Sequence, residues 1–153
     1  YEFPVDRLIQ ALKYGHQLPL AAWLGAQLGE RLVAGDFDLV VPLPLHPARL
    51  RARGFNQSLE IARPLGRALG IPVAPDGLIR TRATPPQAEL PLKERARNVR
   101  GAFEYRGELA GQRVLLVDDV MTTGSTLREA ARILALHGAG PITVAVAARA
   151  LCR

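Results

Sequence analysis

The stretch from Val114 to Thr126, VLLVDDVMTTGST, constrains the fold more than any other part of the chain. Its first four residues are all apolar, and the lack of alternating polarity predicts a strand buried on both faces, as in a parallel sheet. Asp118 and Asp119 follow at the carboxyl end of this strand, the edge at which open α/β sheets bind ligands. The stretch therefore predicts an α/β protein with a ligand site directly after a central strand.

Small hydroxylated residues follow the two acids and lead into a segment with helical periodicity. Their hydroxyls and backbone N–H groups lie where a helix should begin, which favours phosphate binding. Two adjacent carboxylates suit a pair of neighbouring hydroxyls, because each carboxylate accepts hydrogen bonds. The binding site that we expect comprises Asp118, Asp119, Val120, Met121, Thr122, Thr123, Gly124, Ser125 and Thr126.

Three other interpretations of the block compete with this one. A P-loop nucleotide hydrolase also has an acid after a buried strand, but it needs a GxxxxGK[ST] loop, and neither Lys13 nor Lys93 lies in one. A phospho-acceptor domain would hold a metal with adjacent acids, yet the glycine and threonine turn would have no explanation. A structural role would make the acids caps of the next helix, since Asp is a favoured N-cap. The two-part pattern favours a site for phosphate and ribose.

The block resembles the phosphoribosyl-diphosphate (PRPP) motif of the type I phosphoribosyltransferases. This resemblance implies that Asp118 and Asp119 bind the ribose 2′ and 3′ hydroxyls, and that the loop from Thr122 to Thr126 surrounds the 5′-phosphate. It also implies a mainly parallel central sheet flanked by helices, with a small N-terminal helical hood and a flexible loop. Catalysis and contact with Mg²⁺ would fall to the two acids, with PRPP as the substrate.

Composition agrees with one domain over residues 1–153, because a chain that is 48% hydrophobic at this length can bury a core without disulfides. Its one cysteine, Cys152, allows no intrachain disulfide, which favours the cytoplasm. Neither a signal-peptide pattern nor an apolar run of membrane-spanning length is present, so we expect no membrane insertion. The first residue is Tyr1 rather than methionine, so we expect a preceding segment, and a domain upstream stays open.

The net charge of +6 is carried almost wholly by arginine, since only Lys13 and Lys93 among the basic residues are lysines. The planar guanidinium suits phosphate and pyrophosphate. The arginines concentrate in residues 49–53 and 80–106. A small polyanionic ligand, a nucleic acid and an ordinary solvated surface each account for such clusters, and the three explanations remain open.

Helical and strand patterns alternate along the chain, which predicts a parallel sheet with right-handed crossovers. The expected helices span residues 5–14, 20–33, 58–69, 92–99 and 125–137, and the expected strands span residues 39–41, 114–117 and 142–148. Val73 and the pair at 78–79 are weaker strand signals, and Pro64 is a candidate kink. The segment from Arg80 to Arg100 is polar and contains two adjacent prolines, so it is a candidate mobile loop.

Three further pieces narrow the resemblance. They are LIQALKYG, VPLPLHPARLRARGFNQS, and the positions Arg82, Thr84, Gln87, Arg95, Asn98 and Phe103. Over nearly the whole chain they resemble the ComF/GntX-type family, the competence-associated branch of this fold. Many of its members carry a cysteine-rich zinc-binding segment before the first helix. Here that segment either has been lost or precedes Tyr1.

The family position implies that the loop from Pro42 to Phe55 contacts pyrophosphate, and we choose Arg49 and Arg53 for this role. The resemblance implies transfer of the phosphoribosyl group from PRPP, with Mg²⁺, to a nucleobase or other nitrogen nucleophile, with release of pyrophosphate. Residues 80–100 would then close as a lid that excludes water. The alternative is a competence or DNA-uptake module that binds single-stranded DNA or partner proteins and keeps the pocket as a sensor or relic. A homodimer is left open for both.

Overall fold

The computed structural model describes residues 4–15, 17–84 and 91–150. Within the last range it describes only the backbone of Leu92, Lys93 and Arg95. The helices are α1 (Val5–Tyr14), α2 (Leu18–Gly29), α3 (Pro47–Arg53), α4 (Gln57–Leu69), α5 (Leu92–Val99) and α6 (Ser125–Leu136). The strands are β1 (Leu39–Pro42), β2 (Leu78–Arg80), β3 (Phe103–Tyr105), β4 (Val114–Met121) and β5 (Ile142–Arg149). In the described part of the chain, no helix has the length and apolar character to cross a membrane.

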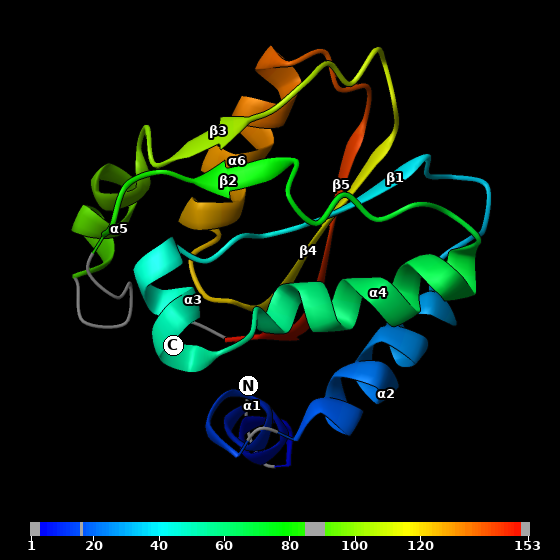
Figure 1. Cartoon of the computed structure of the whole chain (residues 1–153), viewed down its shortest axis with the longest axis vertical. Helices are drawn as coiled ribbons and strands as arrows, with labels where there is room; N and C mark the ends of the chain where they lie inside the picture. Colours follow the sequence, from blue (N-terminus) through cyan, green and yellow to red (C-terminus); the bar gives the residue numbers. More distant parts are fainter. Residues whose placement is uncertain (1–3, 16, 85–90, 151–153) are drawn as a thin grey trace.

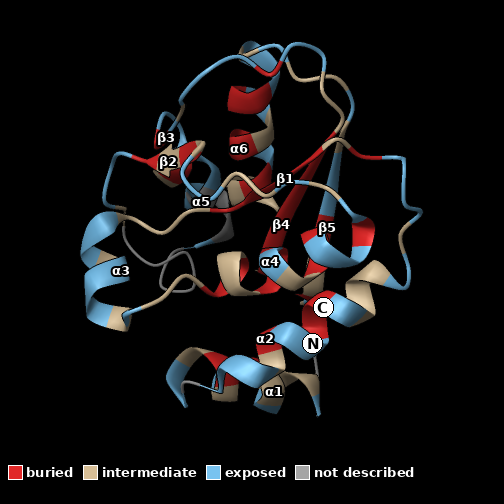
Figure 2. Ribbon diagram, turned by 45° about the vertical axis from the view of Figure 1, so that its right-hand side comes forward, coloured by how far each residue is buried: buried red, intermediate tan, exposed pale blue. Residues whose placement is uncertain are grey.

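A parallel sheet in the order β1-β4-β5 forms the centre of the molecule, as the alternating pattern predicts. Helices α1, α2 and α4 cover one face, and α6 covers the other together with the antiparallel pair β2–β3 (Figure 1). Side chains of β4 alternate between these two cores. Leu115 and Val117 pack with the α4 side, and Val114 and Leu116 with the α6 side. Both faces of β4 are therefore buried (Figure 2), which explains its unbroken apolar run.

Strand β4 is longer than its apolar run, and this corrects the expectation that Asp118 and Asp119 follow the strand. Pairing with β5 continues through Asp118 opposite Val146 and ends at Met121 opposite Arg149. The two acids therefore lie inside β4, near its carboxyl end. The backbone ladder, rather than side-chain polarity, decides where the strand stops.

The expected helix 20–33 is displaced in the structure, because α2 begins at Leu18 and ends at Gly29. Pro19 occupies one of the first helical positions, where a missing N–H costs nothing. Helix α4 runs through Pro64 from Gln57 to Leu69. The other expected helices and strands are present with boundaries within about four residues of those predicted, which is the usual precision for element ends.

The sequence patterns missed α3 and β3. The signals for α3 were present: His46 caps it by accepting a hydrogen bond from the Ala48 N–H, Pro47 is its first residue, and Gly54 follows it with φ of 87°. Proline at the start and glycine after the end are typical of helices. Strand β3 has three residues and pairs with β2, and neither strand is long enough to show a period.

The candidate mobile loop is partly regular structure. Arg80 is the last residue of β2 and is buried, and α5 is the short helix expected at residues 92–99. Arg82 donates hydrogen bonds to the carbonyl oxygens of Asn98 and Arg100, at 3.0 and 2.6 Å. The double proline at 85–86 and Gln87 lie outside the described residues.

Candidate PRPP site

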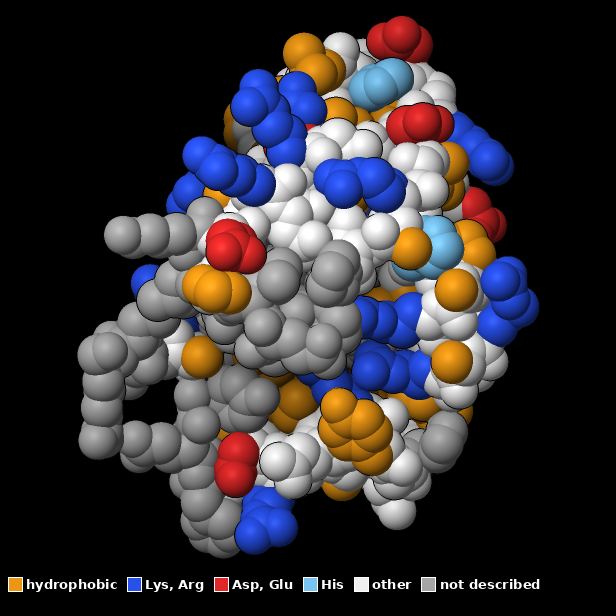
Figure 3. All heavy atoms as spheres, turned by 90° about the vertical axis from the view of Figure 1, so that its left-hand side faces the viewer, with side chains coloured by type: hydrophobic (Ala, Val, Ile, Leu, Met, Phe, Trp, Pro, Cys, Tyr) orange, Lys and Arg blue, Asp and Glu red, His pale blue; other side chains and the backbone are white. Residues whose placement is uncertain are grey.

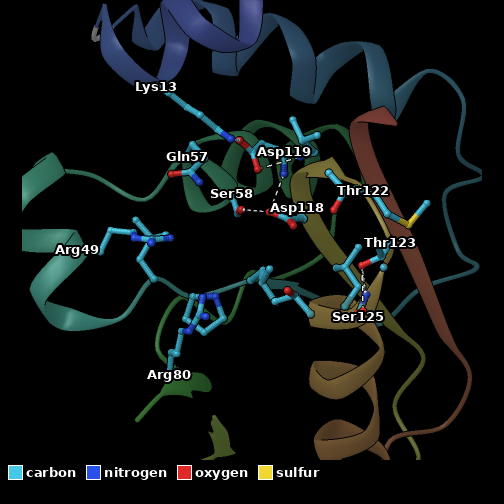
Figure 4. Close-up of a pocket in the computed structure, with 18 residues that line it drawn as sticks. Lys13, Arg49, Gln57, Ser58, Arg80, Asp118, Asp119, Thr122, Thr123 and Ser125 are labelled. Atoms are coloured by element: carbon cyan, nitrogen blue, oxygen red, sulfur yellow. Dashed lines mark hydrogen bonds and ion pairs between the residues drawn. The ribbon is translucent and has the colours of Figure 1, made fainter. Parts of the chain in front are cut away.

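A pocket of about 330 Å³ lies at the carboxyl ends of β1 and β4, where parallel sheets bind ligands. Three groups of side chains surround it: acids from β4, a loop between β4 and α6, and basic residues from other elements (Figure 4). Its lining comprises Lys13, Leu43, Pro44, Leu45, Arg49, Gln57, Ser58, Arg80, Asp118, Asp119, Val120, Met121, Thr122, Thr123, Gly124, Ser125, Thr126 and Leu127.

The two acids are held by different partners. Asp118 Oδ1 accepts hydrogen bonds from Ser58 Oγ at 2.9 Å and from the Asp119 N–H at 2.8 Å. Asp119 Oδ1 accepts from the Val120 N–H at 2.8 Å, and its Oδ2 lies 2.7 Å from Lys13 Nζ. Each carboxylate is thus fixed in orientation, and the pair offers acceptors for two hydroxyl groups.

The environment of Asp118 disfavours its charge. Burial, followed by the nearby negative charge of Asp119, holds the pKa of the Asp118 carboxyl well above its ordinary value. The hydrogen bonds from Ser58 and from the Asp119 N–H oppose this shift only partly. A buried carboxyl in this state costs the protein stability when it ionises, which is typical of functional groups rather than of scaffold.

The loop after β4 has the geometry of an anion site. Gly124 has φ of 75°, a left-handed conformation that side chains rarely adopt, and α6 begins directly after it at Ser125. Thr123 Oγ1 accepts from the Ser125 N–H at 3.3 Å and lies 2.9 Å from Ser125 Oγ. The loop therefore brings hydroxyls and the start of a helix to one wall of the pocket, where the helix dipole favours negative charge.

Two arginines occupy the opposite side of the pocket from this loop. Arg49 comes from α3 and Arg80 from the end of β2, and both lie across the acids from Thr123 and Ser125 (Figure 4). Arg80 is buried, hydrogen-bonds Thr84 Oγ1, and lies 5.5 Å from the centre of the Phe103 ring. Burial, and next the charge of Arg49, lowers the pKa of its guanidinium. Two cations held this close favour a polyanion between them.

Comparison with known proteins agrees with this geometry. The family of phosphoribosyl transferase domains matches residues 56–153. Competence protein F of Haemophilus influenzae is 34% identical, over 98% of this chain and 70% of its own length. The chain belongs to the ComF-like type I phosphoribosyltransferase family. The earlier resemblance and the fold that it implied are thereby confirmed.

Two further relatives extend the comparison. This phosphoribosyltransferase-family chain is 35% identical to the DNA utilization protein YhgH of Escherichia coli, over 94% of the chain and 66% of that protein. The chain thus spans about two thirds of the length of such relatives. Among solved structures, it is similar to the glutamine PRPP amidotransferase of B. subtilis, with a TM-score of 0.58, 28% identity and coverage of 83% of this chain and 26% of the other.

The structure separates the two arginines chosen from the sequence of this phosphoribosyltransferase domain. Arg49 lines the pocket, but Arg53 does not. Arg53 Nη1 donates to Gln57 Oε1 at 2.7 Å, and its guanidinium lies 6.0 Å from the centre of the Tyr14 ring. Residues four apart share one face of a helix, so these contacts with Gln57 and Tyr14, and not the turn of α3, keep the last residue of that helix out of the pocket. Arg80 stands in the pocket with Arg49 instead.

Lys13, Ser58 and Arg80 are pocket residues that sequence reasoning did not select for the site. Each comes from an element far from the PRPP block in the sequence: α1, the start of α4, and β2. Ser58 lies two residues after Asn56, whose side chain caps α4 by accepting a hydrogen bond from the Ser58 N–H. No spacing in the sequence connects these three residues with the acids. Lys13 and Ser58 do fall within the stretches that resemble the ComF-like family, and Arg80 does not.

Proposed function

We propose that this domain binds PRPP together with Mg²⁺ and transfers the phosphoribosyl group to a nitrogen nucleophile, releasing pyrophosphate. One observation carries the proposal: the pocket presents an anion loop, two carboxylates and two arginines in that order (Figure 4). PRPP has the matching order of groups, with a 5′-phosphate, a ribose diol and a 1-diphosphate. The loop from Thr122 to Thr126 would hold the phosphate, Asp118 and Asp119 the diol, and Arg49 with Arg80 the diphosphate.

The reaction breaks the bond between C1 of the ribose and the diphosphate oxygen, while the nucleophile's nitrogen lone pair forms the new bond to C1. Positive charge grows on the ribose and negative charge on the departing diphosphate. Arg49 and Arg80 favour that departure because they place positive charge beside the leaving group. Asp118 and Asp119 orient the ribose through its hydroxyls. A lid built from residues 80–100 remains a prediction, with Arg82 engaged by α5 in the present state.

The donor set of the pocket fits a magnesium ion carried by the substrate. Among the described residues, no cluster of three or more His, Cys, Asp or Glu side chains could hold a metal unaided. Asp118 and Asp119 provide oxygen ligands, and Mg²⁺ commonly keeps several waters and binds chiefly through substrate phosphates. When bound, the ion would neutralise charge on the diphosphate. We place the protein in the cytoplasm, because a phosphorylated sugar does not cross a membrane unaided.

Melting experiments test the binding step. PRPP with Mg²⁺ at a hundred times the dissociation constant should stabilise the protein by about 2.7 kcal/mol. A Ser125→Asp variant provides the matched control, because an acid in the first turn of α6 suits the helix but repels a 5′-phosphate. We expect a ligand-dependent rise in melting temperature for the wild type and none for the variant. No rise in the wild type would overturn the proposal, and a search of nucleobases for pyrophosphate release would identify the acceptor.

A second candidate function is binding of single-stranded DNA, supported by a hollow outside the PRPP pocket. It has a volume of about 340 Å³, adjoins the pocket at Ser125, and carries Arg100, Arg128 and Arg132 between α5 and α6. Glu129 pairs with Arg132 at 2.7 Å, so Arg100 and Arg128 supply the excess positive charge. Figure 3 shows basic side chains spread over one face of the molecule. Relatives named for DNA utilization and competence agree with this candidate.

Changing Arg100 and Arg128 together to alanine should weaken binding of single-stranded DNA and flatten its salt dependence. Each lost phosphate contact removes about 0.7 from the slope of log affinity against log salt. Fluorescence anisotropy at several salt concentrations measures the slope. The control is a variant with both Arg31→Ala and Arg67→Ala, which removes the same charge at two exposed positions outside the hollow. Equal slopes for the double variant and the wild type would remove this surface from the DNA-binding candidate.

A further inference from the structure

Lys13 joins the first helix to the acids of the central strand. It lies in the last turn of α1, and its Nζ is 2.7 Å from Asp119 Oδ2. The Lys13 side chain is 22% exposed and that of Asp119 only 5%. Figure 4 shows the lysine reaching from α1 toward the acids, away from the side of the pocket that holds Arg49 and Arg80. The carboxylate pair therefore has a cation, Lys13, that is paired with Asp119 and is separate from the two arginines of the pocket.

A cation at this place reduces the electrostatic repulsion between the two acids and the proposed substrate. Asp118 and Asp119 are adjacent, and the ligand that must approach them is itself polyanionic. Repulsion between like charges in a partly buried pocket is stronger than in water, because screening is weaker there. Either a divalent cation or a fixed ammonium can offset this repulsion. Lys13 supplies the second kind at hydrogen-bond distance from Asp119.

We propose that Lys13 is the built-in counter-cation of the carboxylate pair and takes the place of a divalent ion at Asp119. This inference rests on the proposed binding of PRPP. Lys13 neutralises Asp119 while the ribose binds, so that Mg²⁺ is needed on the diphosphate and not on the ribose side. It also makes the position of α1 part of the ribose site, because the ammonium is carried by that helix.

This role is tested by measuring PRPP affinity at low and high Mg²⁺ concentration by isothermal titration calorimetry. Lys13→Gln should lower the affinity about tenfold at low Mg²⁺, the worth of one charge-assisted contact. At high Mg²⁺ the loss should shrink, because a metal ion can occupy the vacated position. Lys13→Arg should keep most of the wild-type behaviour, and Arg7→Gln removes one exposed charge from the same helix as a control.

A purely structural role for Lys13 predicts a different result. Its loss would then lower the affinity by the same factor at every Mg²⁺ concentration, or leave it unchanged, and either outcome overturns the inference. Melting curves for all variants establish that each is folded under the conditions of the calorimetric titration. Absence of PRPP binding by the wild type would instead count against the proposed function itself.

Binding of Mn²⁺ alone gives a readout that needs no PRPP. Electron paramagnetic resonance reports free Mn²⁺ directly as the ion is added to the protein. We expect Lys13→Gln to bind one Mn²⁺ at the acids more tightly than the wild type, by about tenfold, and Arg7→Gln to behave as the wild type. Equal Mn²⁺ affinity in Lys13→Gln and the wild type would show that Lys13 does not occupy a cation position.

Discussion

Replacing Asp118 with asparagine is expected to lower PRPP affinity by about 1 to 3 kcal/mol, the cost of losing a charged hydrogen-bond acceptor. The same change is expected to raise the melting temperature near neutral pH. Asn has the shape of Asp and can still accept from Ser58 Oγ and the Asp119 N–H. It removes a buried negative charge beside a second one. Function and stability should therefore move in opposite directions.

The pH dependence of this stability gain follows from the pKa of Asp118. Because that pKa is raised in the folded protein, the neutral carboxyl contributes stability that is fully present below its unfolded pKa and is lost as the pH rises through the folded pKa. The melting temperatures of Asp118→Asn and the wild type should nearly coincide in acid and separate as the pH rises. Thermal melts across this range measure the difference, with exposed Asp36→Asn as control.

Isothermal titration calorimetry measures the PRPP affinity of the same variants. Asp36→Asn should leave PRPP affinity unchanged, since Asp36 does not line the pocket. If Asp118→Asn bound PRPP as tightly as the wild type, Asp118 would not be an acceptor for the ribose. A melting temperature that fell equally at every pH would mean that the Asp118 side chain stabilises the fold through contacts that do not depend on its charge.

Gly25→Ala is expected to destabilise the protein by about 1 to 3 kcal/mol, although alanine is the better helix former. Gly25 lies in α2 against α4, where an added Cβ would be 2.5 Å from Pro64 Cγ and 2.6 Å from the Ile61 carbonyl oxygen. Alanine in place of glycine gains only about 1 kcal/mol in a helix. The overlap includes backbone, which cannot move aside without separating the helices, so the steric cost should exceed the gain.

Chemical denaturation of Gly25→Ala and Ala26→Gly separates the two contributions. Ala26 is the next residue of α2 and is exposed, so its change to glycine measures helix propensity alone and should cost about 1 kcal/mol. A stability for Gly25→Ala equal to or above that of the wild type would mean that α2 and α4 can separate at little cost. Helix α1 packs against α2, so its position beside the pocket would then also be less firmly held.

Some of this architecture could be predicted from local patterns. The unbroken apolar run at 114–117 requires cover on both faces, and the structure provides it with two separate cores. Helix α1 follows from apolar residues at helical spacing, and the turn at Gly124 from the small residues after the acids. Each of these inferences needs only neighbours in the chain, because the period of a helix or strand and the conformation of a glycine are local properties.

The cations of the pocket could not be predicted in this way, because contacts between distant parts of the chain bring them there. No spacing in the sequence relates Lys13 to Asp119 or Ser58 to Asp118, and helix packing brings them to 2.7 and 2.9 Å. Arg80 enters the pocket because β2 pairs with β3, whereas Arg53 is held outside it by Gln57.

Short-range pattern was enough to predict the parallel sheet, two acids near the carboxyl end of its central strand, and a turn of small residues after them. Tertiary packing was needed to place Lys13, Arg49 and Arg80 in the pocket and to bury Asp118, which raises the pKa of its carboxyl. The physical reason is that charge interactions and desolvation depend on distance through space, and the packing of whole helices and strands sets that distance.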